Sequence, residues 1–453
     1  MSSDGLIGTH IDLPYLPEGW IWKSLSELVD PNRGICYGIV QPGKHDPIGV
    51  PMVNTGDVSD GNVASDIAFK VSTDLHSKFR RSTLRGGELL VTLVGANFGR
   101  VAIAPERFKG FNCSRAVGVV PLIEDAKYVM FALRSPLTRH LMDTWANTTA
   151  QPTFNLKDLG NLPIPLPPKF EREAIAEAIS AFDDRINLLR ETNTTLEAIA
   201  QALFKSWFVD FDPVHAKMQG RAPEGMDDAT AALFPDSFEE SELGAVPKGW
   251  QVMPIGDAVE TVGGATPDTK TPEYWEPAEH HWTTPKDLSG IASPVLLSTE
   301  RKLSNAGIKK ISSGLLPVGS LLMSSRAPIG YLALAQTPMA INQGYIAMPP
   351  GGKLSPLYML FWCQTNMDNI KGRANGSTFM EISKKAFRPI PALVAPQSIL
   401  DPFDEVARSL FSLLVENEKQ AQTLSALRDT LLPRLISGQL QLPEAVKLEE
   451  ALE

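Results

Sequence analysis

The 453-residue chain has few cysteines and no long apolar run, and each shortage limits what the protein can be. Its three cysteines, Cys36, Cys113 and Cys363, are odd in number and far apart, so a disulfide framework is not expected. No apolar stretch approaches the roughly 20 residues that a membrane-spanning helix needs, and the first residues lack a basic-then-apolar signal pattern. We therefore expect a cytoplasmic protein with no membrane partner.

Sequence motifs for catalysis and cofactor binding are also missing. The stretch "GANFGR" at Gly95–Arg100 lacks the Lys and Ser/Thr of a phosphate-binding loop. No glycine-rich dinucleotide fingerprint follows a strand, and no G-x-S-x-G turn occurs. No Cys or His pair has zinc spacing, since His280 and His281 are adjacent. These absences favour a binding protein with no catalytic residue, no metal ligand and no cofactor of its own.

The chain repeats its own pattern over two halves. "LPEGW" at Leu16–Trp20 returns as "VPKGW" at Val246–Trp250, and further matches follow in the same order. They join residues 52–58 with 282–288, 79–90 with 308–322, 111–120 with 340–348, and 151–168 with 376–396. Five ordered matches predict a duplicated chain with an internal pseudo-two-fold repeat. Asp57 and Asp287 fall opposite each other, in contexts typical of turn or cap residues.

Each copy ends in a long helical pattern whose apolar positions alternate in steps of four and three, as in a coiled coil. The predicted pairing residues are Ile175, Ile179, Phe182, Ile186, Leu189, Asn193, Leu196 and Leu203, and in the second helix Phe403, Val406, Leu410, Leu413, Asn417, Leu424, Leu427 and Leu431. Each stripe contains an asparagine, which in a buried position fixes register or partner. We predict that the two helices pair with each other as an antiparallel coiled coil. The alternative is an amphipathic helix packed on its own domain.

The parts before the two helices mix short β-branched runs with helical ones, so the predicted fold class is α+β, with two mixed α/β domains. The expected organisation is a first domain at residues 1–168, a central helix at 169–208, an acidic connector at 209–245, a second domain at 246–395, a C-terminal helix at 396–437 and an acidic tail at 438–453. The segment Lys127–Trp145 has a helical pattern with a proline break.

The charge pattern points to a polyanionic partner despite a net charge of −10. Lys70–Arg115 contains nine Lys/Arg against three Asp/Glu, and Arg301–Met367 contains six Lys/Arg and no acid. Both clusters lie in the same part of the repeat. A phosphate backbone requires a local positive surface, whatever the total charge. A solvated basic face is the alternative, and recurrence in both copies favours nucleic acid.

Base recognition needs particular side chains as well as charge. Arginine pairs with guanine, and Asn or Gln pairs with adenine, each through two hydrogen bonds. Thr153, and Ser377 or Thr378 in the second copy, stand where a helix N-cap is expected, whose N–H groups suit a phosphate, although caps without a ligand are commoner. The candidate DNA-binding residues are Lys78, Arg80, Arg81, Arg85, Asn97, Arg100, Arg115, Thr153, Lys286, Lys309, Lys310, Arg326, Asn342, Gln343, Ser377 and Thr378.

Three long phrases carry a family resemblance: "LEAIAQALFKSWFVDFDPVHAKMQG" at Leu196–Gly220, "LFPDSFEESELGAVPKGW" at Leu233–Trp250 and "LRDTLLPRLISGQL" at Leu427–Leu440. With the duplicated halves, they make the chain resemble the DNA-specificity subunit of type I restriction–modification enzymes. The resemblance implies two recognition domains, each reading one half of an asymmetric, bipartite site in double-stranded DNA. It also implies that two methyltransferase subunits dock on the paired helices and that restriction/translocase subunits complete the complex.

The resemblance further implies that S-adenosylmethionine, ATP and Mg²⁺ bind to the partner subunits, with none bound by this chain. Base-contacting residues vary within that family, so the candidate residues rest on charge and chemistry alone. Two other hypotheses remain. The chain could be a two-headed coiled-coil scaffold without DNA readout, or the specificity module of a single-chain enzyme, for which catalytic domains are missing from these 453 residues.

Overall fold

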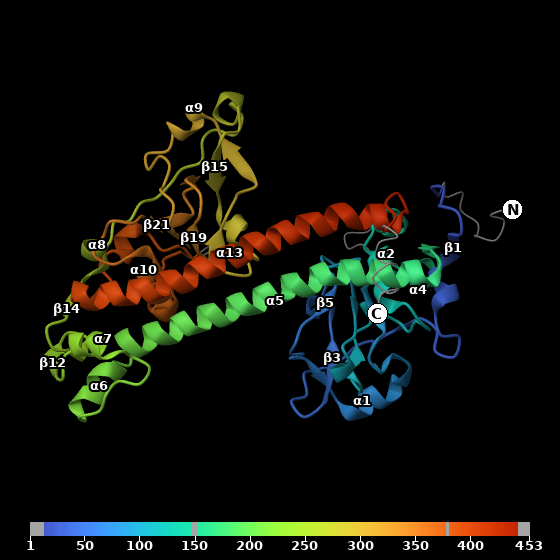
Figure 1. The fold of residues 1–453 in the computed structure, drawn as a ribbon, viewed down its shortest axis with the longest axis horizontal. Helices are drawn as coiled ribbons and strands as arrows, with labels where there is room; N and C mark the ends of the chain where they lie inside the picture. Colours follow the sequence, from blue (N-terminus) through green and yellow to red (C-terminus); the bar gives the residue numbers. More distant parts are fainter. Residues whose placement is uncertain (1–12, 147–152, 377–379, 443–453) are drawn as a thin grey trace, which may run out of the picture. The chain divides into compact units, whose positions relative to one another are not determined.

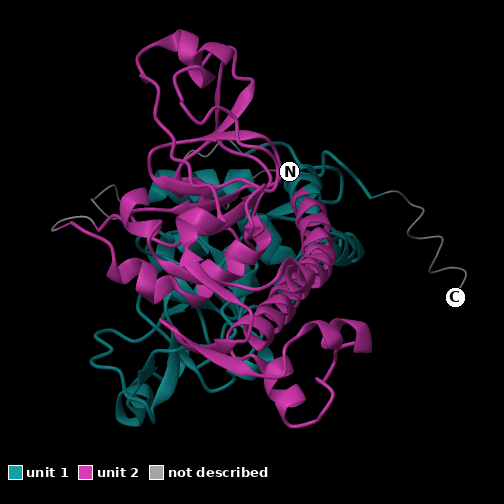
Figure 2. Cartoon of the chain, turned by 90° about the vertical axis from the view of Figure 1, so that its left-hand side faces the viewer, with its two compact units in different colours: residues 1–186, 423–453 teal, residues 187–422 magenta. Residues whose placement is uncertain are grey.

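A computed structural model describes residues 13–146, 153–376 and 380–442. The chain forms two compact units, unit 1 (Met1–Ile186 with Thr423–Glu453) and unit 2 (Asn187–Gln422), which Figure 2 shows in two colours. Two helices of 40 residues, α5 (Lys169–Phe208) and α13 (Gln397–Ile436), each begin in one unit and end in the other. The unit boundaries therefore fall inside the helices and not at the helix ends, because each half of a helix packs in its own core.

The described residues of unit 1 form three small sheets besides the β4–β5 hairpin (Val58–Ser59 and Asn62–Val63). The four-stranded antiparallel sheet has the order β2 (Cys36–Tyr37), β10 (Val117–Val120), β7 (Leu89–Thr92), β8 (Val101–Ile103). The three-stranded sheet has the order β6 (Lys70–Val71), β3 (Val50–Val53), β9 (Asn112–Cys113), with β3 parallel to β9. β1 (Ile21–Ser24) pairs with β11 (Pro163–Leu166).

Unit 2 repeats these sheets. The four-stranded sheet has the order β16 (Val295–Leu296), β19 (Leu332–Ala335), β18 (Leu321–Ser324), β21 (Tyr345–Met348). The three-stranded sheet has the order β17 (Arg301–Leu303), β15 (His280–Thr283), β20 (Met339–Ile341), with β15 parallel to β20. β14 (Gln251–Pro254) pairs with β22 (Pro391–Val394).

The strand registers match between the two units. Met52 pairs with Asn112 in the parallel pair of unit 1, as Trp282 pairs with Ala340 in unit 2. Each unit thus has a mixed α+β domain built on the same topology, and the predicted repeat is confirmed. The copies differ at opposite edges of the larger sheet: unit 1 adds β2 beside β10, whereas unit 2 adds β16 beside β19, the equivalent of β8.

Helices cover these sheets at equivalent places. In unit 1, α2 (Ala126–Leu133) and α3 (Pro136–Trp145) are separated at a proline, as predicted, and Ser135 caps α3. In unit 2, α10 (Pro356–Thr365) and α11 (Met367–Gly372) follow β21, and Ser355 caps α10. Proline at the first helical position loses no hydrogen bond, so it starts each helix without strain. The shorter helices are α1 (Thr73–Lys78), α4 (Leu156–Asn161), α8 (Ile255–Ala258), α9 (Asn305–Ile308) and α12 (Lys384–Phe387).

The acidic segment between α5 and the second domain is folded. It forms α6 (Asp212–Met218), α7 (Asp228–Leu233) and the hairpin β12–β13 (Phe238–Ser241 and Gly244–Pro247). Val214 and Phe234 are buried in the same cluster as Trp207 and Trp250. Their burial makes this segment part of the core of unit 2, so it is more than a connector.

The two repeated tryptophans anchor their domains in different ways. Trp20 is buried in the core of unit 1, and its indole N–H donates to Glu171 Oε2 at 3.0 Å. Trp250 packs against Phe208 and Phe211, with ring centroids 5.8 and 5.7 Å apart. In each unit the tryptophan thus fixes the start of the domain to α5 or to the chain directly after α5.

The long helices pack against each other in antiparallel orientation within each unit (Figure 1). In unit 2, Asn417 Nδ2 donates to Asn193 Oδ1 at 2.9 Å, while Phe204, further along α5, meets Phe403, which comes earlier in α13. In unit 1, Ile175 and Ile179 share a buried cluster with Leu432, Leu435 and Ile436 of α13. The buried asparagine pair satisfies its own amides, because Asn193 Nδ2 also donates to Leu414 O at 3.2 Å.

The predicted stripe of α13 was wrong at three positions. Val406, Leu413 and Leu427 are 45%, 50% and 48% exposed, whereas the residues directly after the first two, Ala407 and Leu414, are 0% and 2% exposed. Phe403, Leu410, Asn417, Leu424 and Leu431 belong to the inward-facing stripe as predicted. Between them, the next inward position comes four residues after each of these residues, whereas the prediction placed it three residues after. Ala407 and Ala421 are buried but small, so a search for large apolar side chains misses them.

In α5 the predicted positions lie inward. Ile175, Ile179, Ile186, Leu189, Asn193 and Leu196 are buried, and Phe182 and Leu203 are half-buried. Phe204, next to Leu203, is the more buried of the two, because it fills a cluster of aromatic rings that includes Phe208 and Tyr358.

The corrected stripe makes a stability prediction. Leu414→Ala should lower the free energy of unfolding by about 2–5 kcal/mol, because it leaves a cavity between α5 and α13. Leu413→Ala, its exposed neighbour, should change it by no more than about 0.5 kcal/mol. Urea unfolding followed by circular dichroism measures both variants. Equal losses of stability would contradict the assignment of the buried face.

Candidate nucleic-acid interface

Several loops of each unit gather at one edge of the sheets, which we call the loop edge. Because β3 and β9 are parallel, the segments after them emerge on the same side, as is usual for binding sites in sheets with parallel strands. The loop edge comprises residues 38–41, 54–57, 93–100, 114–116 and 153–155 in unit 1, and residues 264–268, 284–288, 325–330, 342–344 and 381–383 in unit 2.

Backbone hydrogen bonds tie the loop edge of unit 1 together. Ser114 N donates to Val53 O at 2.9 Å, and Leu93 N donates to Ala116 O at 2.8 Å. Phe154 N then donates to Leu93 O at 3.0 Å. Four segments that are distant in sequence are therefore held side by side by main-chain atoms, whatever their side chains.

Unit 2 has the same three bonds. Asn342 N donates to Thr283 O at 3.0 Å, Ser325 N to Gly344 O at 2.8 Å, and Ile382 N to Ser325 O at 3.0 Å. The repeated pattern makes Ser114 of unit 1 equivalent to Asn342 of unit 2, and Leu93 equivalent to Ser325. The loop edge is thus one scaffold present twice, with different side chains on it.

The turns after β3 and β15 are closed by the two repeated aspartates. Asp57 Oδ2 accepts from Asn54 N, and Asp287 Oδ2 accepts from Thr284 N, both at 2.7 Å. These are capping boxes of the short 3-10 helices at Thr55–Asp57 and Pro285–Leu288, so the expected cap role of both aspartates is confirmed.

Two glycines that the sequence analysis missed allow another segment to cross this edge. After Gly38, Ile39 N donates to Cys113 O at 2.6 Å, and after Gly264, Ala265 N donates to Ile341 O at 3.1 Å. A Cβ on Gly38 would lie 2.0 Å from Cys113 O, and one on Gly264 would lie 1.8 Å from Ile341 O. Only glycine permits this approach. The signal in the sequence is a glycine in equivalent places of both copies.

The side chains of three candidate residues of unit 1 donate hydrogen bonds to main-chain carbonyl oxygens. Asn97 Nδ2 donates to Thr55 O at 3.1 Å, and Arg100 Nη1 donates to Val58 O at 3.3 Å. Arg81 Nη2 donates to Arg33 O at 3.2 Å, away from the loop edge. In the part of the chain that the structure describes, the side chains of four others have no hydrogen bond or ion pair, namely Lys78, Arg80, Arg85 and Arg115.

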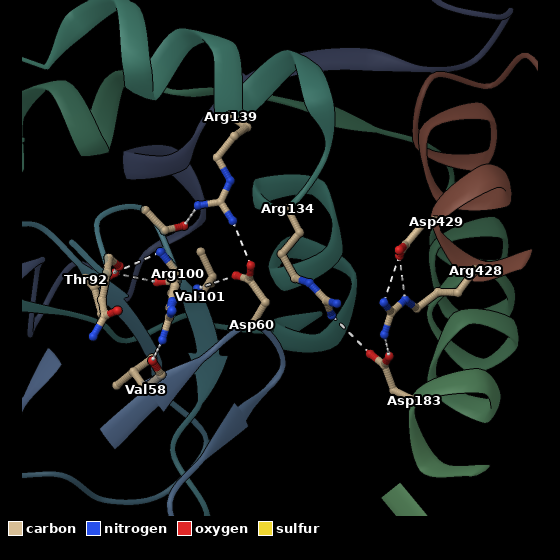
Figure 3. Close-up of polar contacts among 12 residues, drawn as sticks. Val58, Asp60, Thr92, Arg100, Val101, Arg134, Arg139, Asp183, Arg428 and Asp429 are labelled. Atoms are coloured by element: carbon tan, nitrogen blue, oxygen red, sulfur yellow. Dashed lines mark hydrogen bonds and ion pairs between the residues drawn. The ribbon is translucent and has the colours of Figure 1, made fainter. Parts of the chain in front are cut away.

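The surroundings of Arg100 are linked to α3 by charged contacts (Figure 3). Asp60 accepts from Val101 N at 3.1 Å and pairs with Arg139 of α3 at 2.8 Å. Arg139 also donates to Gly99 O. Arg139 therefore fixes the β7–β8 loop and the tip of the β4–β5 hairpin at once.

A second, separate set of charged contacts joins the domain of unit 1 to its long helices. Arg134, which follows α2, pairs with Asp183 of α5 at 3.0 Å, and Arg428 of α13 pairs with the same carboxylate (Figure 3). Arg428 also contacts Asp429 at 2.8 Å. All three charges at Asp183 are mostly buried, so removal of the carboxylate would leave two guanidinium groups poorly solvated.

Most candidate residues of unit 2 have partners within the chain. Lys286 pairs with Glu300 at 3.4 Å, and Arg326 pairs with Glu381 at 3.7 Å. Lys310 Nζ lies 5.2 Å from the Tyr274 ring centroid. The Lys286 pair is well exposed, so it contributes little to stability and can open for a phosphate.

The remaining candidates of unit 2 differ in how firmly they are held. Asn342 Oδ1 accepts from Gly344 N at 2.8 Å, which closes the turn after β20. Gln343 is exposed, and its Oε1 accepts from the Thr266 hydroxyl at 2.7 Å. Lys309 has no side-chain hydrogen bond or ion pair among the residues described.

The predicted N-cap at Thr153 was wrong. Thr153 forms a bridge with Val94, and the cap of α4 is Asn155, whose Oδ1 accepts from Asp158 N at 2.9 Å. Thr153 is instead extended, because the β7–β8 loop pairs with it. In unit 2, Ser383 caps α12, and the candidates Ser377 and Thr378 lie outside the described residues.

A basic and aromatic group in unit 2 was also missed. The Arg301 guanidinium lies 3.8 Å from the Trp275 ring centroid and 5.1 Å from that of Trp282. On the same sheet, burial and then the nearby Lys302 lower the pKa of His281, whose Nδ1 accepts from Thr299 N at 3.2 Å. These contacts join residues that are distant in sequence, so no spacing pattern reveals them.

Three comparisons place the chain among known proteins. A family model described as the type I restriction modification DNA specificity domain matches residues 17–198 and 247–421. The type I restriction enzyme MjaIX specificity subunit of Methanocaldococcus jannaschii is 36% identical over 189 residues, which are 40% of this chain and 42% of that protein. The HindI specificity subunit of Haemophilus influenzae is 24% identical over 437 residues, 86% of this chain and 94% of that protein.

A solved structure has the same fold. The crystal structure of a type I restriction–modification S subunit from M. genitalium has a TM-score of 0.53 at 18% identity, and the match covers 92% of this chain and 96% of that one. Among the helices that the structure describes, none combines the length and the apolar character required to cross a bilayer.

The crossing at Gly38 can be tested by stability. Gly38→Ala should lower the free energy of unfolding by about 2 kcal/mol or more, because its Cβ would overlap Cys113 O and the backbone would have to shift. Gly56→Ala, on the same loop edge, should change it by less than about 1 kcal/mol, since nothing lies within 4 Å of its Cβ position. Thermal melting compares the two. A stable Gly38→Ala variant would mean that the crossing is not tight.

Proposed function

Because the chain belongs to the type I restriction–modification DNA specificity family, we propose that each unit reads one half of an asymmetric target in double-stranded DNA. The observation that carries the proposal is the loop edge, one main-chain scaffold present twice with different side chains. A duplicated scaffold with divergent side chains suits a target whose two halves differ in sequence. A single catalytic site would not need the duplication.

The charge distribution supports DNA as the ligand. Unit 1 presents Lys78, Arg80, Arg85 and Arg115 without side-chain partners in its described part, and unit 2 presents Lys309 in the same way. Free cations can neutralise phosphates and release counterions, which makes binding strongly dependent on salt. The protein's overall negative charge resides elsewhere, in the helices, the α6–α7 segment and the tail.

The long helices offer a surface for partner subunits. Leu188 and Ile199 of α5, and Val406, Leu413 and Leu427 of α13, are 45% to 52% exposed. These exposed apolar side chains on the helices support a protein contact there. We propose that two methyltransferase subunits dock on these helices, and that restriction/translocase subunits join them.

In this proposal the chain guides its partner subunits to the DNA target and carries out no reaction itself. S-adenosylmethionine, ATP and Mg²⁺ would bind to the partner subunits, and this chain would contribute sequence recognition alone. We also place the complex in the cytoplasm, which is supported by three buried, free cysteine thiols that suit a reducing compartment.

The central experiment maps methylated bases. The chain is co-expressed with a type I methyltransferase subunit from the same genome, and methylation is read across the host genome. We expect one two-part motif, and exchange of residues 20–165 for the same segment of a relative should change only one of its parts. A change in both parts would contradict independent reading, and no methylation in any motif would contradict the proposed function.

Salt dependence tests the free cations. Arg80→Ala or Lys309→Ala should weaken binding to duplex DNA uniformly, and should reduce the slope of log affinity against log salt by about 0.9 for each phosphate that the variant no longer neutralises. Arg185→Ala and Lys205→Ala remove the same charge from exposed positions on α5 and should leave the slope unchanged. Fluorescence anisotropy over a salt series measures it. If all variants had identical slopes, Arg80 and Lys309 would not contact phosphates, and other residues would have to do so.

A further inference from the structure

We propose that Arg115 and Gln343, which occupy one equivalent position of the two units, are specificity-determining residues: Arg115 recognises a guanine and Gln343 an adenine. The inference rests on the proposed function and deepens it, because it selects one position out of a broad basic surface.

The equivalence of the two positions follows from the main chain. Arg115 is the middle residue of the turn 114–116 after β9, and Gln343 is the middle residue of the turn 342–344 after β20. The residue before each donates to the end of the parallel neighbour strand, to Val53 O or to Thr283 O. The residue after each accepts from the chain that leaves β7 or β18. Both middle residues therefore sit in turns that are fixed on both sides.

The two side chains are the exposed members of these turns. Arg115 and Gln343 are exposed, whereas Ser114, Ala116 and Asn342 are half-buried and Gly344 is buried. A tethered backbone with one projecting side chain loses little conformational freedom on binding, which favours a specific contact.

The residue types match the two usual direct contacts in the major groove. A guanidinium donates two hydrogen bonds to guanine O6 and N7, and a carboxamide both accepts from adenine N6 and donates to N7. Within the described residues, the Arg115 guanidinium has no hydrogen bond or ion pair, so all of its donors are available.

A hydrogen bond from a neighbouring segment restrains the glutamine side chain. The Thr266 hydroxyl donates to Gln343 Oε1 at 2.7 Å. This bond fixes the amide plane and leaves both N–H groups and one lone pair of Oε1 for a base. Thr266 belongs to the segment after Gly264. The corresponding segment of unit 1 contacts Arg115 as well, because Ile39 O accepts from Arg115 N at 2.8 Å.

The other candidate Arg and Asn residues of the loop edge are committed to the chain itself. Asn97 and Arg100 hold Thr55 O and Val58 O, and Asn342 closes its own turn. Arg326 is paired with Glu381. A base contact by any of these four would require breaking an existing interaction, so among the six candidate Arg, Asn and Gln residues of the loop edge Arg115 and Gln343 are the two whose side chains can meet a base without rearrangement.

The test uses a pool of randomised duplex DNA and the full chain, co-expressed with its methyltransferase subunit. Bound duplexes are selected and sequenced for wild type, Arg115→Gln and Gln343→Arg. We expect Arg115→Gln to change guanine to adenine at one position of one half-site, and Gln343→Arg to change adenine to guanine at one position of the other. The preference at that position should shift by about 5- to 100-fold, the range expected for one bidentate contact.

Two controls separate base reading from charge and from folding. Arg80→Gln removes the same charge from an exposed arginine outside the loop edge, and it should leave every position of the motif unchanged. Gln343→Leu keeps a similar size without hydrogen bonding, and it should relax one position without creating a guanine preference. Thermal melting of each variant shows whether unit stability is retained; both substituted side chains are exposed, so melting should match wild type.

Each outcome has one meaning. An unchanged wild-type motif in both swap variants would overturn the inference and leave the proposed function intact. Uniformly weaker binding of Arg115→Gln, with a lower salt slope and the same motif, would make Arg115 a phosphate contact and would equally overturn it. A wild-type chain that selects no motif would overturn the proposed function, and the inference with it.

Discussion

The crossing of one strand end by a glycine-led segment is the contact on which each loop edge depends. Cys113 O and Ile341 O each accept a hydrogen bond from the segment after Gly38 or Gly264, at the ends of the parallel strand pairs. The turn that carries Arg115 or Gln343 begins at the next residue. If the crossing segment lay further from the strand end, the turn would lose its contact with that segment. The position of the exposed side chain is therefore set by main-chain geometry, which does not depend on which bases are read.

Polar residues around this edge mainly stabilise it. A single hydrogen bond contributes about 0.5–1.5 kcal/mol net, while ordering one loop residue costs about 1–2 kcal/mol. Individual side-chain contacts such as Asn97 to Thr55 O cannot order the β7–β8 loop alone. The loop is held because its two ends continue β7 and β8 and because Arg139 contacts both it and Asp60. A rigid edge of this kind uses several polar side chains for its own structure, and few remain for the ligand.

The sequence predicted the features that are local or repeated. The duplication, the long helices, the proline break before α3 and the cap role of Asp57 and Asp287 all follow from patterns within short segments. The errors concern contacts between distant segments. Ala407 is buried because α5 packs against it, and Thr153 is extended because Val94 pairs with it.

The candidate site shows the same limit. Charge and residue type selected Arg115 and Gln343 together with fourteen others, and nothing in the sequence separated them from Asn97 or Arg326. The separation needs the partners of each side chain, which depend on segments about 40 to 80 residues away in the chain. Equivalence between the copies added the decisive information, since the turns at 114–116 and 342–344 could be matched through their main-chain bonds.

Apolar packing joins each domain to the long helices, and each unit adds a different set of contacts to this joint. In unit 1 the added contacts are ionic, with Asp183 between Arg134 and Arg428. In unit 2 they are aromatic, with Phe204, Phe208 and Phe403 around Tyr358. An ionic joint demands exact geometry from all three groups, because a displaced partner leaves a charge poorly solvated. Aromatic packing tolerates small shifts in ring position at a smaller cost in stability. The helices and the sheets are repeated, whereas the joints are not, so each recognition domain can change its joint and its exposed side chains while the main-chain scaffold stays the same.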